Sequence, residues 1–556
     1  MNEKILIAVA WPYANGSLHL GQIAGAYLTP DIFARYHRAL GNDVLMVSGS
    51  DAHGTPVTLR AEQEGISPGD VLARFQPEFL KSWEDLGIGF DIFTSTHTEN
   101  HFECAQEIFR GLMRNGHVYE AEVELWYCPS DRRFLPDRYV EGTCPFCGYD
   151  GARGDQCDNC GRTLDASQLL EPRCRLDGTT PELRPTRHLF FRMSSFNGPL
   201  AEWLKSCEGL MRRPVLSWSL GITEEGMPDR AITRDIEWGV PVPTEGYEDK
   251  RIYVWVEALI GYFSAAVEWA KKRGEPERWR EWWHNPDSRH YYFVGKDNIP
   301  FHTLIWPAML MGCGEIYGGE LRLPYDVPAN QYVNFKGAKA STSRGTAPFL
   351  PEYLKVYDPD ALRYYLSANM PELQDSSFDD ADLIRRNNDE LVATWGNLVN
   401  RVLAFTVRNF DGVVPEPGEL DETSREVLEA ARATVGDVGD QISLCRFRSG
   451  LQAAFATARR LNQYLDEAAP WKALKTDRQD AARSLWVAIQ AINALKTALY
   501  PYLPFTSQRL HEYLGFDGLL GDSGWSAEGV PVGQKLAAPQ PLFKKLDAAE
   551  ILVSAD

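Results

Sequence analysis

The sequence predicts an α/β fold with a parallel sheet, a cysteine-rich insertion and a final helical bundle. In two separate stretches, short apolar runs end in polar, glycine-rich clusters, as the strands of open parallel sheets do. Two Cys-x-x-Cys-Gly motifs lie between these stretches. From about residue 385 onward, apolar residues recur at helical spacing, which indicates a bundle.

The composition indicates a multidomain protein without a membrane span. Its 556 residues predict several domains, and a hydrophobic content of 44% supplies large cores. No apolar run is long enough to cross a bilayer, and the run over 5–11 is too short for a secretory signal. We therefore expect a cytoplasmic protein whose ten cysteines are thiols or metal ligands. A net charge of −20 argues against coating nucleic acid through bulk charge but leaves a local basic face open.

The first element is an apolar strand over 5–9, followed by a turn and a helix. The turn, Ala10-Trp11-Pro12-Tyr13-Ala14-Asn15-Gly16, carries Pro, Asn and Gly, which favour turns. We expect Ser17 to cap a helix that runs to about Tyr36, with a kink or restart at Pro30. A helix that opens at a strand's carboxyl end offers free N–H groups and a favourable dipole to an anion.

His19 and Gly21 lie in the first turn of that helix, where a phosphate would bind. His19 can donate a hydrogen bond to such a ligand, and Gly21 removes a side chain where the ligand would lie close. An ordinary strand–helix unit with a surface histidine is the alternative.

The second strand, over 44–47, ends in another polar cluster over 48–56. Two strand ends of this kind, side by side, form the crevice in which open α/β sheets hold ligands. Asp51 in this cluster suits an ammonium group, although capping of the next helix is an equally good role for it.

Two knuckle motifs predict a structural zinc site in the insertion. Cys144-Pro145-Phe146-Cys147-Gly148 and Cys157-Asp158-Asn159-Cys160-Gly161 together offer four thiolates, which satisfy tetrahedral zinc. A redox Cys-x-x-Cys motif would not need two copies with matching glycines.

A second pair of motifs brackets the first and has aspartate where cysteine would complete a knuckle. The motifs are Cys128-Pro129-Ser130-Asp131 and Cys174-Arg175-Leu176-Asp177. A zinc site with two thiolates and two carboxylates is chemically reasonable, and a lost site held by hydrogen bonds is the alternative. Neither pair has the open position of a catalytic zinc.

After the insertion the α/β pattern returns, with many aromatic residues. We expect a strand over 253–258 that runs into Leu259-Ile260-Gly261-Tyr262, and another over 290–294. The second ends in Gly295-Lys296-Asp297, and a carboxylate at such a strand end suits ribose hydroxyls. The aromatic residues either line an apolar ligand pocket or belong to the core.

Two later segments have the composition of ligand-binding elements. The small, basic stretch over 334–346 suits a polyphosphate, with a solvated linker as the alternative. On the first bundle helix Asn397 and Arg401 share a face, and Pro470-Trp471 stands at a helix end. An amide, a guanidinium and an aromatic ring suit unpaired bases, whereas a capped helix with a buried tryptophan is the alternative.

Taken together, the order of these motifs resembles that of class I aminoacyl-tRNA synthetases, most closely the methionyl-tRNA synthetase family. The resemblance covers essentially the whole chain. The stretches that carry it most specifically are Pro12-Tyr13-Ala14-Asn15-Gly16, Asp51-Ala52-His53-Gly54-Thr55-Pro56, Phe134-Leu135-Pro136-Asp137-Arg138 and Ile299-Pro300-Phe301-His302.

The resemblance implies a Rossmann-type parallel sheet with a zinc-knuckle insertion, followed by an anticodon-binding bundle. The implied parts are 1–118 and 231–325 for the two catalytic halves, 119–230 for the insertion, 326–385 for the stem-contact region and 386–556 for the bundle and tail. The implied reaction joins methionine and ATP, used with Mg²⁺, into methionyl-adenylate, and then transfers methionine to the terminal adenosine of a methionine tRNA.

The resemblance also assigns roles to individual residues. The methionine pocket would comprise Tyr13, Asp51, Trp255, Tyr262, Phe301 and His302. ATP would be held by His19, Gly21, Gly295, Asp297, Lys339 and Thr342, with Gln22 and Arg234 beside the reacting groups. The CAU anticodon would be read by Asn397, Arg401 and Trp471. Some members of the family dimerise through an additional C-terminal module. We expect this chain to lack that module and therefore to be a monomer.

The chain departs from the family's pattern at both signature motifs. His-x-Gly-His is replaced by His19-Leu20-Gly21-Gln22, and Lys-Met-Ser-Lys-Ser by Lys339-Ala340-Ser341-Thr342-Ser343. Gln22 and Thr342 donate hydrogen bonds but carry no charge, which leaves compensation by Lys336 or Arg344 open. Trp11 stands where many relatives have a smaller apolar residue, and Leu259 where some have proline. A non-catalytic relative that binds tRNA or methionine, and a specialised inhibitor-resistant paralogue, are the alternatives to an active ligase.

Overall fold

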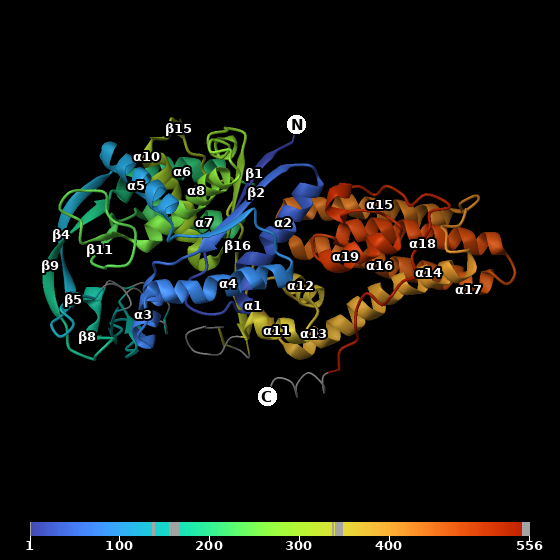
Figure 1. Cartoon of the computed structure of the whole chain (residues 1–556), viewed down its shortest axis with the longest axis horizontal. Coiled ribbons are helices and arrows are strands. Elements are labelled where there is room, and N and C mark those ends of the chain that lie inside the picture. Colours follow the sequence, from blue (N-terminus) through green and yellow to red (C-terminus); the bar gives the residue numbers. More distant parts are fainter. Residues whose placement is uncertain are drawn as a thin grey trace.

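A five-stranded parallel sheet forms the centre of the first part of the molecule (Figure 1). The computed structural model describes residues 2–135, 139–154, 157, 159–160, 162, 164, 166–335, 338–339 (backbone) and 348–547. The strands, in spatial order, are β16 (Ala329–Asn330), β13 (Arg289–Gly295), β1 (Lys4–Val9), β2 (Asp43–Ser50) and β3 (Ile92–Ser95). The strands predicted over 5–9, 44–47 and 290–294 are thus confirmed. The chain order reverses at β1, and such a switch point opens a crevice at the carboxyl ends of the strands.

The helical segment after β1 begins two residues later than predicted. It consists of α1 (Leu20–Gln22), a wide π turn η1 (Ile23–Tyr27) and α2 (Leu28–Ala39). The prediction that Ser17 caps it is wrong, because His19 is the cap. The His19 side chain accepts a hydrogen bond from the Gln22 N–H, and the Gln22 side chain accepts one from the His19 N–H, which together form a capping box.

A long helix, α8 (Val254–Lys272), stands where we predicted a strand over 253–258, and that prediction is wrong. A short apolar run does not by itself distinguish a strand from a buried helix. The distinguishing pattern is the spacing of Trp255, Leu259 and Tyr262, which places all three on one helical face that lines a cavity.

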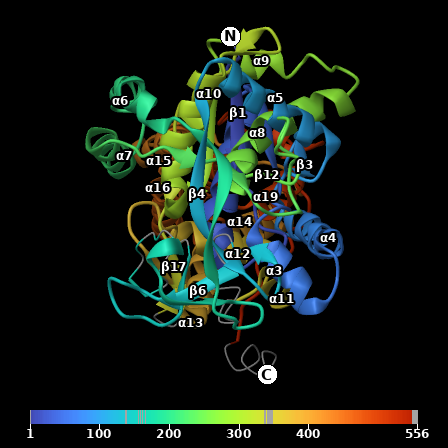
Figure 2. The same cartoon turned by 90° about the vertical axis from the view of Figure 1, so that its left-hand side faces the viewer.

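The insertion contains two antiparallel sheets (Figure 2). The first consists of β10 (Arg230–Ala231), β9 (Glu182–Phe191), β4 (Val118–Cys128) and β5 (Arg133–Phe134). The second consists of β7 (Ala152–Arg153), β6 (Val140–Thr143) and β8 (Leu170–Cys174). Figure 2 shows β4 and β6 on the face turned toward the viewer.

The last part of the chain is helical, as predicted (Figure 1, orange to red). A π-helical segment, η8 (Asn387–Gly396), leads into the bundle. The helices are α14 (Asn397–Asn409), α15 (Glu422–Ser443), α16 (Phe447–Ala468), α17 (Pro470–Ala473), α18 (Arg478–Leu499) and α19 (Pro504–Tyr513). Among the described residues, no helix combines the length and apolar character that a membrane crossing requires. The division into five parts at residues 118, 230, 325 and 385 stays a prediction.

A fully buried ion pair joins the sheet region to the bundle. Arg363 of α12 (Pro359–Ala368) contacts Asp31 of α2 with 2.7 Å between Nη2 and Oδ2. The same guanidinium donates to the carbonyl oxygens of Pro501 and Tyr502, at 2.7 and 2.9 Å, in the turn before α19. Arg35 adds a second ion pair to Asp31 at 2.9 Å. The Asp31 carboxylate and the guanidinium groups of Arg363 and Arg35 all have hydrogen-bond or ion-pair partners. This buried contact therefore fixes the position of the bundle relative to the sheet region.

Candidate active site

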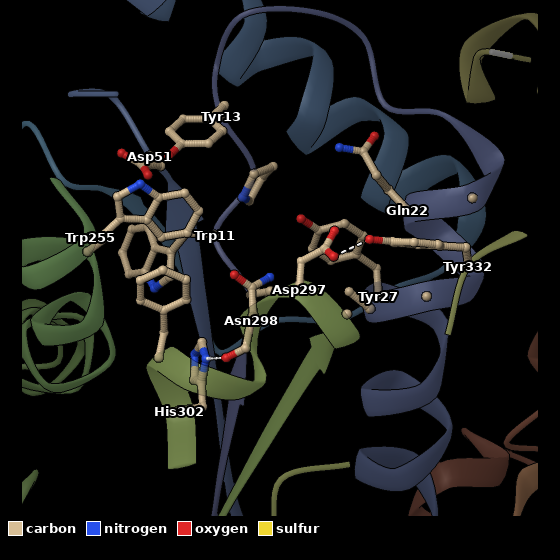
Figure 3. A pocket seen from close by; sticks show the side chains of 18 of the residues that line it. Trp11, Tyr13, Gln22, Tyr27, Asp51, Trp255, Asp297, Asn298, His302 and Tyr332 are labelled. Atoms are coloured by element: carbon tan, nitrogen blue, oxygen red, sulfur yellow. Dashed lines mark hydrogen bonds between the residues drawn. The ribbon is translucent and has the colours of Figure 1, made fainter. Parts of the chain in front are cut away.

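A cavity of about 320 Å³ opens at the carboxyl ends of β1, β2 and β13 (Figure 3). Its size falls in the range of ligand pockets, and polar groups converge on a largely aromatic wall. The predicted site residues that line it are Tyr13, His19, Gly21, Gln22, Asp51, Trp255, Tyr262, Gly295, Asp297, Phe301 and His302. The structure therefore brings together residues that lie almost 300 positions apart in the sequence.

Asp51 is buried beside the turn that follows β1. The Asp51 N–H donates to the carbonyl of Pro12 at 2.8 Å, and the Ala14 N–H donates to the carbonyl of Asp51 at 3.1 Å. These bonds extend the pairing of β1 and β2 to the cavity. Burial, followed by the negative charge of Glu257, raises the pKa of the Asp51 carboxyl well above its usual value. A cationic ligand would favour the ionised form.

Beneath Asp51 lies a buried charged network that the sequence analysis missed. Glu257 of α8 contacts Nδ1 of His53 at 2.8 Å and Nε2 of His101 at 2.5 Å. The His53 N–H donates to Asp51 Oδ1 at 3.3 Å. Although burial opposes it, His53 and His101 hold the pKa of Glu257 below its usual value. A glutamate within the apolar run 254–270 was the available signal, since a buried carboxylate requires partners.

Aromatic rings form one wall of the cavity. Trp255 and Phe301 stack with ring centroids 4.4 Å apart and 17° between their planes, and Tyr13 meets Trp255 edge-on at 6.1 Å. Gly54 leaves room for Tyr13, because a Cβ at Gly54 would lie 2.1 Å from Tyr13 Cε1. The result is a rigid apolar surface close to the Asp51 carboxylate (Figure 3).

His302 is buried at the base of the same wall. Its Nδ1 lies 2.8 Å from the Asn298 carbonyl and must donate to it, so Nε2 accepts from the Tyr262 hydroxyl, also at 2.8 Å. Burial lowers the pKa of His302 to about 4. The imidazole is therefore neutral at pH 7, with its orientation fixed by both bonds.

Trp11 occupies space that two glycines leave open. A Cβ at Gly49 would lie 2.1 Å from Cζ3 of the indole, and a Cβ at Gly261 would lie 2.6 Å from Cζ2. The ring centroids of Trp11 and Tyr262 are 6.2 Å apart. The indole thus reaches between β2 and α8 and takes up volume that a smaller residue would leave to a ligand.

The start of α1 forms the opposite side of the cavity. A Cβ at Gly21 would lie 3.0 Å from His19 Nδ1 and 3.4 Å from Phe335, so a side chain at Gly21 would crowd both rings. Figure 3 shows the Gln22 amide nitrogen turned toward the cavity. The Leu20 N–H donates to the Pro348 carbonyl at 3.1 Å, so the segment that begins at Pro348, after the 334–346 stretch, lies beside α1.

Asp297 is engaged by a residue that no local motif identified. The Tyr332 hydroxyl donates to Asp297 Oδ1 (Figure 3). The position of Tyr332 is set by Asp375, whose Oδ1 accepts from the Tyr332 N–H at 2.9 Å and from Lys296 Nζ at 2.8 Å. Tyr332 thus places a hydroxyl on the carboxylate that was predicted to bind ribose hydroxyls.

Of the remaining residues predicted at this site, Arg234 does not line the cavity, whereas the side chains of Lys339 and Thr342 are not described. Arg234 of β11 (Thr233–Arg234) donates to the carbonyls of Ala231 and Thr233 at 3.0 and 2.9 Å. Its guanidinium lies 3.7 Å from the centroid of the Tyr253 ring. Lys339 belongs to β18 (Ala338–Lys339), of which only the backbone is described, and Thr342 lies outside the described residues together with Lys336 and Arg344.

The predicted anticodon residues lie on α14 and α17 of the bundle, and Figure 1 shows α17 at the end of the molecule away from α1. The Arg401 guanidinium lies 4.8 Å from the centroid of the Trp471 ring, and Asn397 stands one turn earlier on α14. Ala469 adopts the left-handed conformation with φ of 40°, where α16 ends ahead of Pro470. This sharp turn brings Trp471 to α14.

The predicted metal ligands form two separate clusters. The Sγ atoms of Cys144, Cys147, Cys157 and Cys160 all lie within 4.8 Å of one another. Cys144 and Cys160 are 3.9 Å apart, and Cys147 and Cys157 are 3.6 Å apart, close to the sulfur spacing around tetrahedral zinc. These four residues fit a structural zinc ion. The second predicted group, Cys128, Asp131, Cys174 and Asp177, converges within the same limit.

Comparisons with known proteins agree over nearly the whole chain. Residues 5–403 match the family model described as tRNA synthetases class I (M), and residues 414–552 match the anticodon binding domain of methionyl tRNA ligase. A methionine–tRNA ligase of Thermomicrobium roseum is 49% identical over 578 residues, covering 99% of this chain and 98% of the relative. One from Dehalococcoides mccartyi is 52% identical over 547 residues, covering 98% of both.

A solved structure has the same architecture. Mycobacterium tuberculosis methionyl-tRNA synthetase in complex with methionyl-adenylate superposes with a TM-score of 0.81 at 25% identity. The match covers 98% of this chain and 100% of that chain.

Proposed function

Since the chain belongs to the methionyl-tRNA synthetase family of class I, we infer that it is a methionine–tRNA ligase. It activates methionine with ATP to methionyl-adenylate and then transfers methionine to the 3′-terminal adenosine of its tRNA. The observation that supports this most directly is a buried carboxylate, Asp51, set against an aromatic wall in one cavity. That pairing suits an amino acid with an ammonium group and an apolar side chain.

We propose that Asp51 holds the α-ammonium group of methionine. Trp255, Phe301 and Tyr13 pack on its thioether, since sulfur makes favourable contacts with aromatic rings. The neutral His302, held by Tyr262, closes the base of this pocket without adding a charge.

We propose that ATP binds between α1 and β13. His19 and the first turn of α1 face the phosphates, and Gly295 and Asp297 hold the ribose. Ribose hydroxyls would take the place of the Tyr332 hydroxyl on Asp297. The protein carries out little covalent chemistry in this step, because positioning and charge stabilisation lower the barrier.

The signature residues Gln22, Lys339 and Thr342 are proposed to act on the phosphates of ATP, which is used with Mg²⁺. Gln22 also supports the cap of α1, so one side chain serves both the fold and the ligand. Arg234 would contribute only at a distance, since its guanidinium is engaged by backbone carbonyls.

We propose that Asn397, Arg401 and Trp471 read the CAU anticodon of a methionine tRNA. A base stacks on the indole while the amide and guanidinium bond its edges. Arg401 already lies over Trp471 and contacts Asp466 Oδ1 at 3.3 Å, which keeps the guanidinium in place.

The four cysteines of the first cluster are proposed to hold a structural zinc ion. When bound, zinc cross-links the two knuckles. The cytoplasmic location stays a prediction, based on the expectation that the cysteines are thiols or metal ligands. The monomeric state stays a prediction.

Methionine-dependent exchange of pyrophosphate into ATP tests this function. Purified, zinc-replete protein should catalyse exchange, and Asp51→Asn should reduce kcat/KM for methionine far more than Asp287→Asn, which alters an exposed residue. Methionine binding without exchange would contradict the proposal and point to the non-catalytic alternative.

A further inference from the structure

Tyr332 crosses the part of the cavity in which we place ATP. It directly precedes β17 (Val333–Phe335), and Phe335 lies close to Gly21 of α1. From this side the Tyr332 side chain reaches Asp297, which follows β13 on the other side, and its hydroxyl donates to the carboxylate (Figure 3). The phenol thus occupies the position that we assign to the ribose of ATP.

The Tyr332 hydroxyl offers Asp297 the same kind of hydrogen bond as a ribose hydroxyl, because both are O–H groups that donate to a carboxylate oxygen. Burial, followed by the bond to Asp297, raises the pKa of the Tyr332 phenol, which therefore keeps its proton at pH 7. A ribose that replaces the phenol gains one bond to Asp297 while the protein loses another. The ribose therefore contributes less to binding than it would at a carboxylate without the phenol.

The side chain of Tyr332 can leave the carboxylate without a movement of its backbone. The Tyr332 N–H donates to Asp375 Oδ1 at 2.9 Å, and the Tyr332 carbonyl accepts from the Ser376 N–H, also at 2.9 Å. These bonds anchor the backbone of Tyr332 beside β19 (Ser376–Phe378). The ring is only partly buried and lies beneath Lys296, whose Nζ is 3.9 Å from the ring centroid. Because such a contact is weak at a partly exposed site, rotation of the side chain alone releases the hydroxyl.

We propose that Tyr332 is an internal competitor of the nucleotide: its hydroxyl holds the ribose position on Asp297 until ATP displaces it, and returns there when AMP leaves. This inference rests on the proposed function, since it takes Asp297 as the carboxylate that binds the ribose. ATP, methionyl-adenylate and AMP carry the same ribose, but methionyl-adenylate is also held by the methionine pocket. The competitor therefore acts more on AMP, which lacks those contacts, and favours the release of AMP after methionine has been transferred.

Calorimetric binding of ATP, AMP and 2′,3′-dideoxyATP to the full chain tests this competition. The variant Tyr332→Phe keeps the ring and removes only the hydroxyl. ATP and AMP should each bind this variant about three- to tenfold more tightly than the unaltered protein, the range expected for one net hydrogen bond. The affinity for 2′,3′-dideoxyATP should not change, because this nucleotide has no ribose hydroxyl that could donate to Asp297.

Tyr119→Phe is the matched control, because the Tyr119 hydroxyl also donates to an aspartate, Asp229, at 2.9 Å, but belongs to β4 of the insertion. Its affinities for all three nucleotides should equal those of the unaltered protein. Weaker binding of ATP by Tyr332→Phe would overturn the proposal, since the hydroxyl would then orient Asp297 for the ribose. Unchanged binding of ATP, or an equal gain for 2′,3′-dideoxyATP, would overturn it as well.

Pyrophosphate exchange separates this inference from the proposed function. Tyr332→Phe should lower KM for ATP by a similar factor and leave KM for methionine unchanged, and AMP should inhibit the variant at a correspondingly lower concentration. Exchange by the unaltered protein, with the same constants in the variant, would contradict only the role of Tyr332. Absence of exchange in the unaltered protein would contradict the proposed function, and the binding measurements would still decide whether Tyr332 competes at Asp297.

Discussion

Trp11 limits the size of the proposed methionine pocket, because its indole fills the space between Gly49 and Gly261. Trp11→Leu should therefore raise the activation of a bulkier thioether amino acid relative to methionine by about tenfold, the discrimination typical of one methylene group. Pyrophosphate exchange with each amino acid measures the ratio. Trp218→Leu, on the exposed face of α7 (Arg213–Glu225), is the control. Equal ratios in all three proteins would remove this role for Trp11.

The negative charge of Glu257 should affect how kcat/KM for methionine depends on pH. Burial and Glu257 raise the pKa of Asp51, and a protonated Asp51 does not pair with an ammonium group. Hence kcat/KM for methionine should fall as the pH drops through this raised pKa, at a pH above the ordinary aspartate range. Glu257→Gln removes the neighbouring charge and should move the fall to lower pH.

Glu257→Asp retains the charge and is the matched control for this shift. Its profile should stay close to that of the unaltered protein. If Glu257→Gln left the profile in place, Glu257 would have only a structural role beneath Asp51.

Site residues that lie within local motifs could be predicted from the sequence. Residues that contact them from distant parts of the chain could not. Asp51, His19 and Asp297 stand at strand or helix ends, where local sequence already indicates a ligand. Tyr332 follows β16, more than 30 positions after Asp297, and only the parallel pairing of β16 with β13 brings the two together. No local pattern carries that information.

At the scale of elements, α8 shows how a short window misleads. The run 253–258 has the apolar and aromatic character of a buried strand, and the helical period becomes clear only over the full 19 residues. The helix places Trp255 toward the cavity and Glu257 toward His53 and His101. In a strand, Trp255 and Glu257 would instead lie on the same face, because side chains alternate with a period of two residues.

The short helix α17 presents Trp471 to α14, and this predicts a separation of the two reaction steps. Trp471→Ala should lower kcat/KM for tRNA aminoacylation by about 10- to 100-fold, since stacking of a base contributes roughly 1–3 kcal/mol. Pyrophosphate exchange should be unchanged, because α17 lies at the far end of the molecule from α1 (Figure 1).

Trp218→Ala is the control for both assays of the Trp471 variant. An equal loss in exchange and aminoacylation would mean that Trp471 supports the fold of the bundle. In that case the assignment of the anticodon to this face would be wrong.

At the scale of the whole molecule, the order of the parts was predictable and their contacts were not. Composition and motif order place a sheet, an insertion and a bundle along the chain. Asp31 and Arg363 lie 332 positions apart, and neither stands in a motif. Their pairing depends on how α2 and α12 pack, which is a property of the folded chain.

The buried Arg363 should hold the bundle to the sheet region. Arg363→Met leaves the carbonyls of Pro501 and Tyr502 without this donor, and Asp31 keeps only the Arg35 ion pair and the hydrogen bond from the Gly89 N–H. We expect a loss of about 3–5 kcal/mol of stability, as for other broken buried pairs, measured by urea unfolding. Arg110→Met, at an exposed site, should change stability by less than about 0.5 kcal/mol. Equal midpoints for the two variants would contradict this role.

The packing of Trp11 against Gly261 also constrains the order in which this pocket can evolve. The three atoms nearest to a Cβ at Gly261 all belong to the indole, whereas a Cβ at Gly49 also meets the backbone of Thr94. Position 261 is therefore free to change after Trp11 has been replaced by a smaller residue, but not before. Once alanine or a larger residue is fixed there, reversion to tryptophan at position 11 is blocked. The effect of a substitution at either position therefore depends on the residue at the other. Related lineages should show tryptophan at position 11 only together with glycine at position 261.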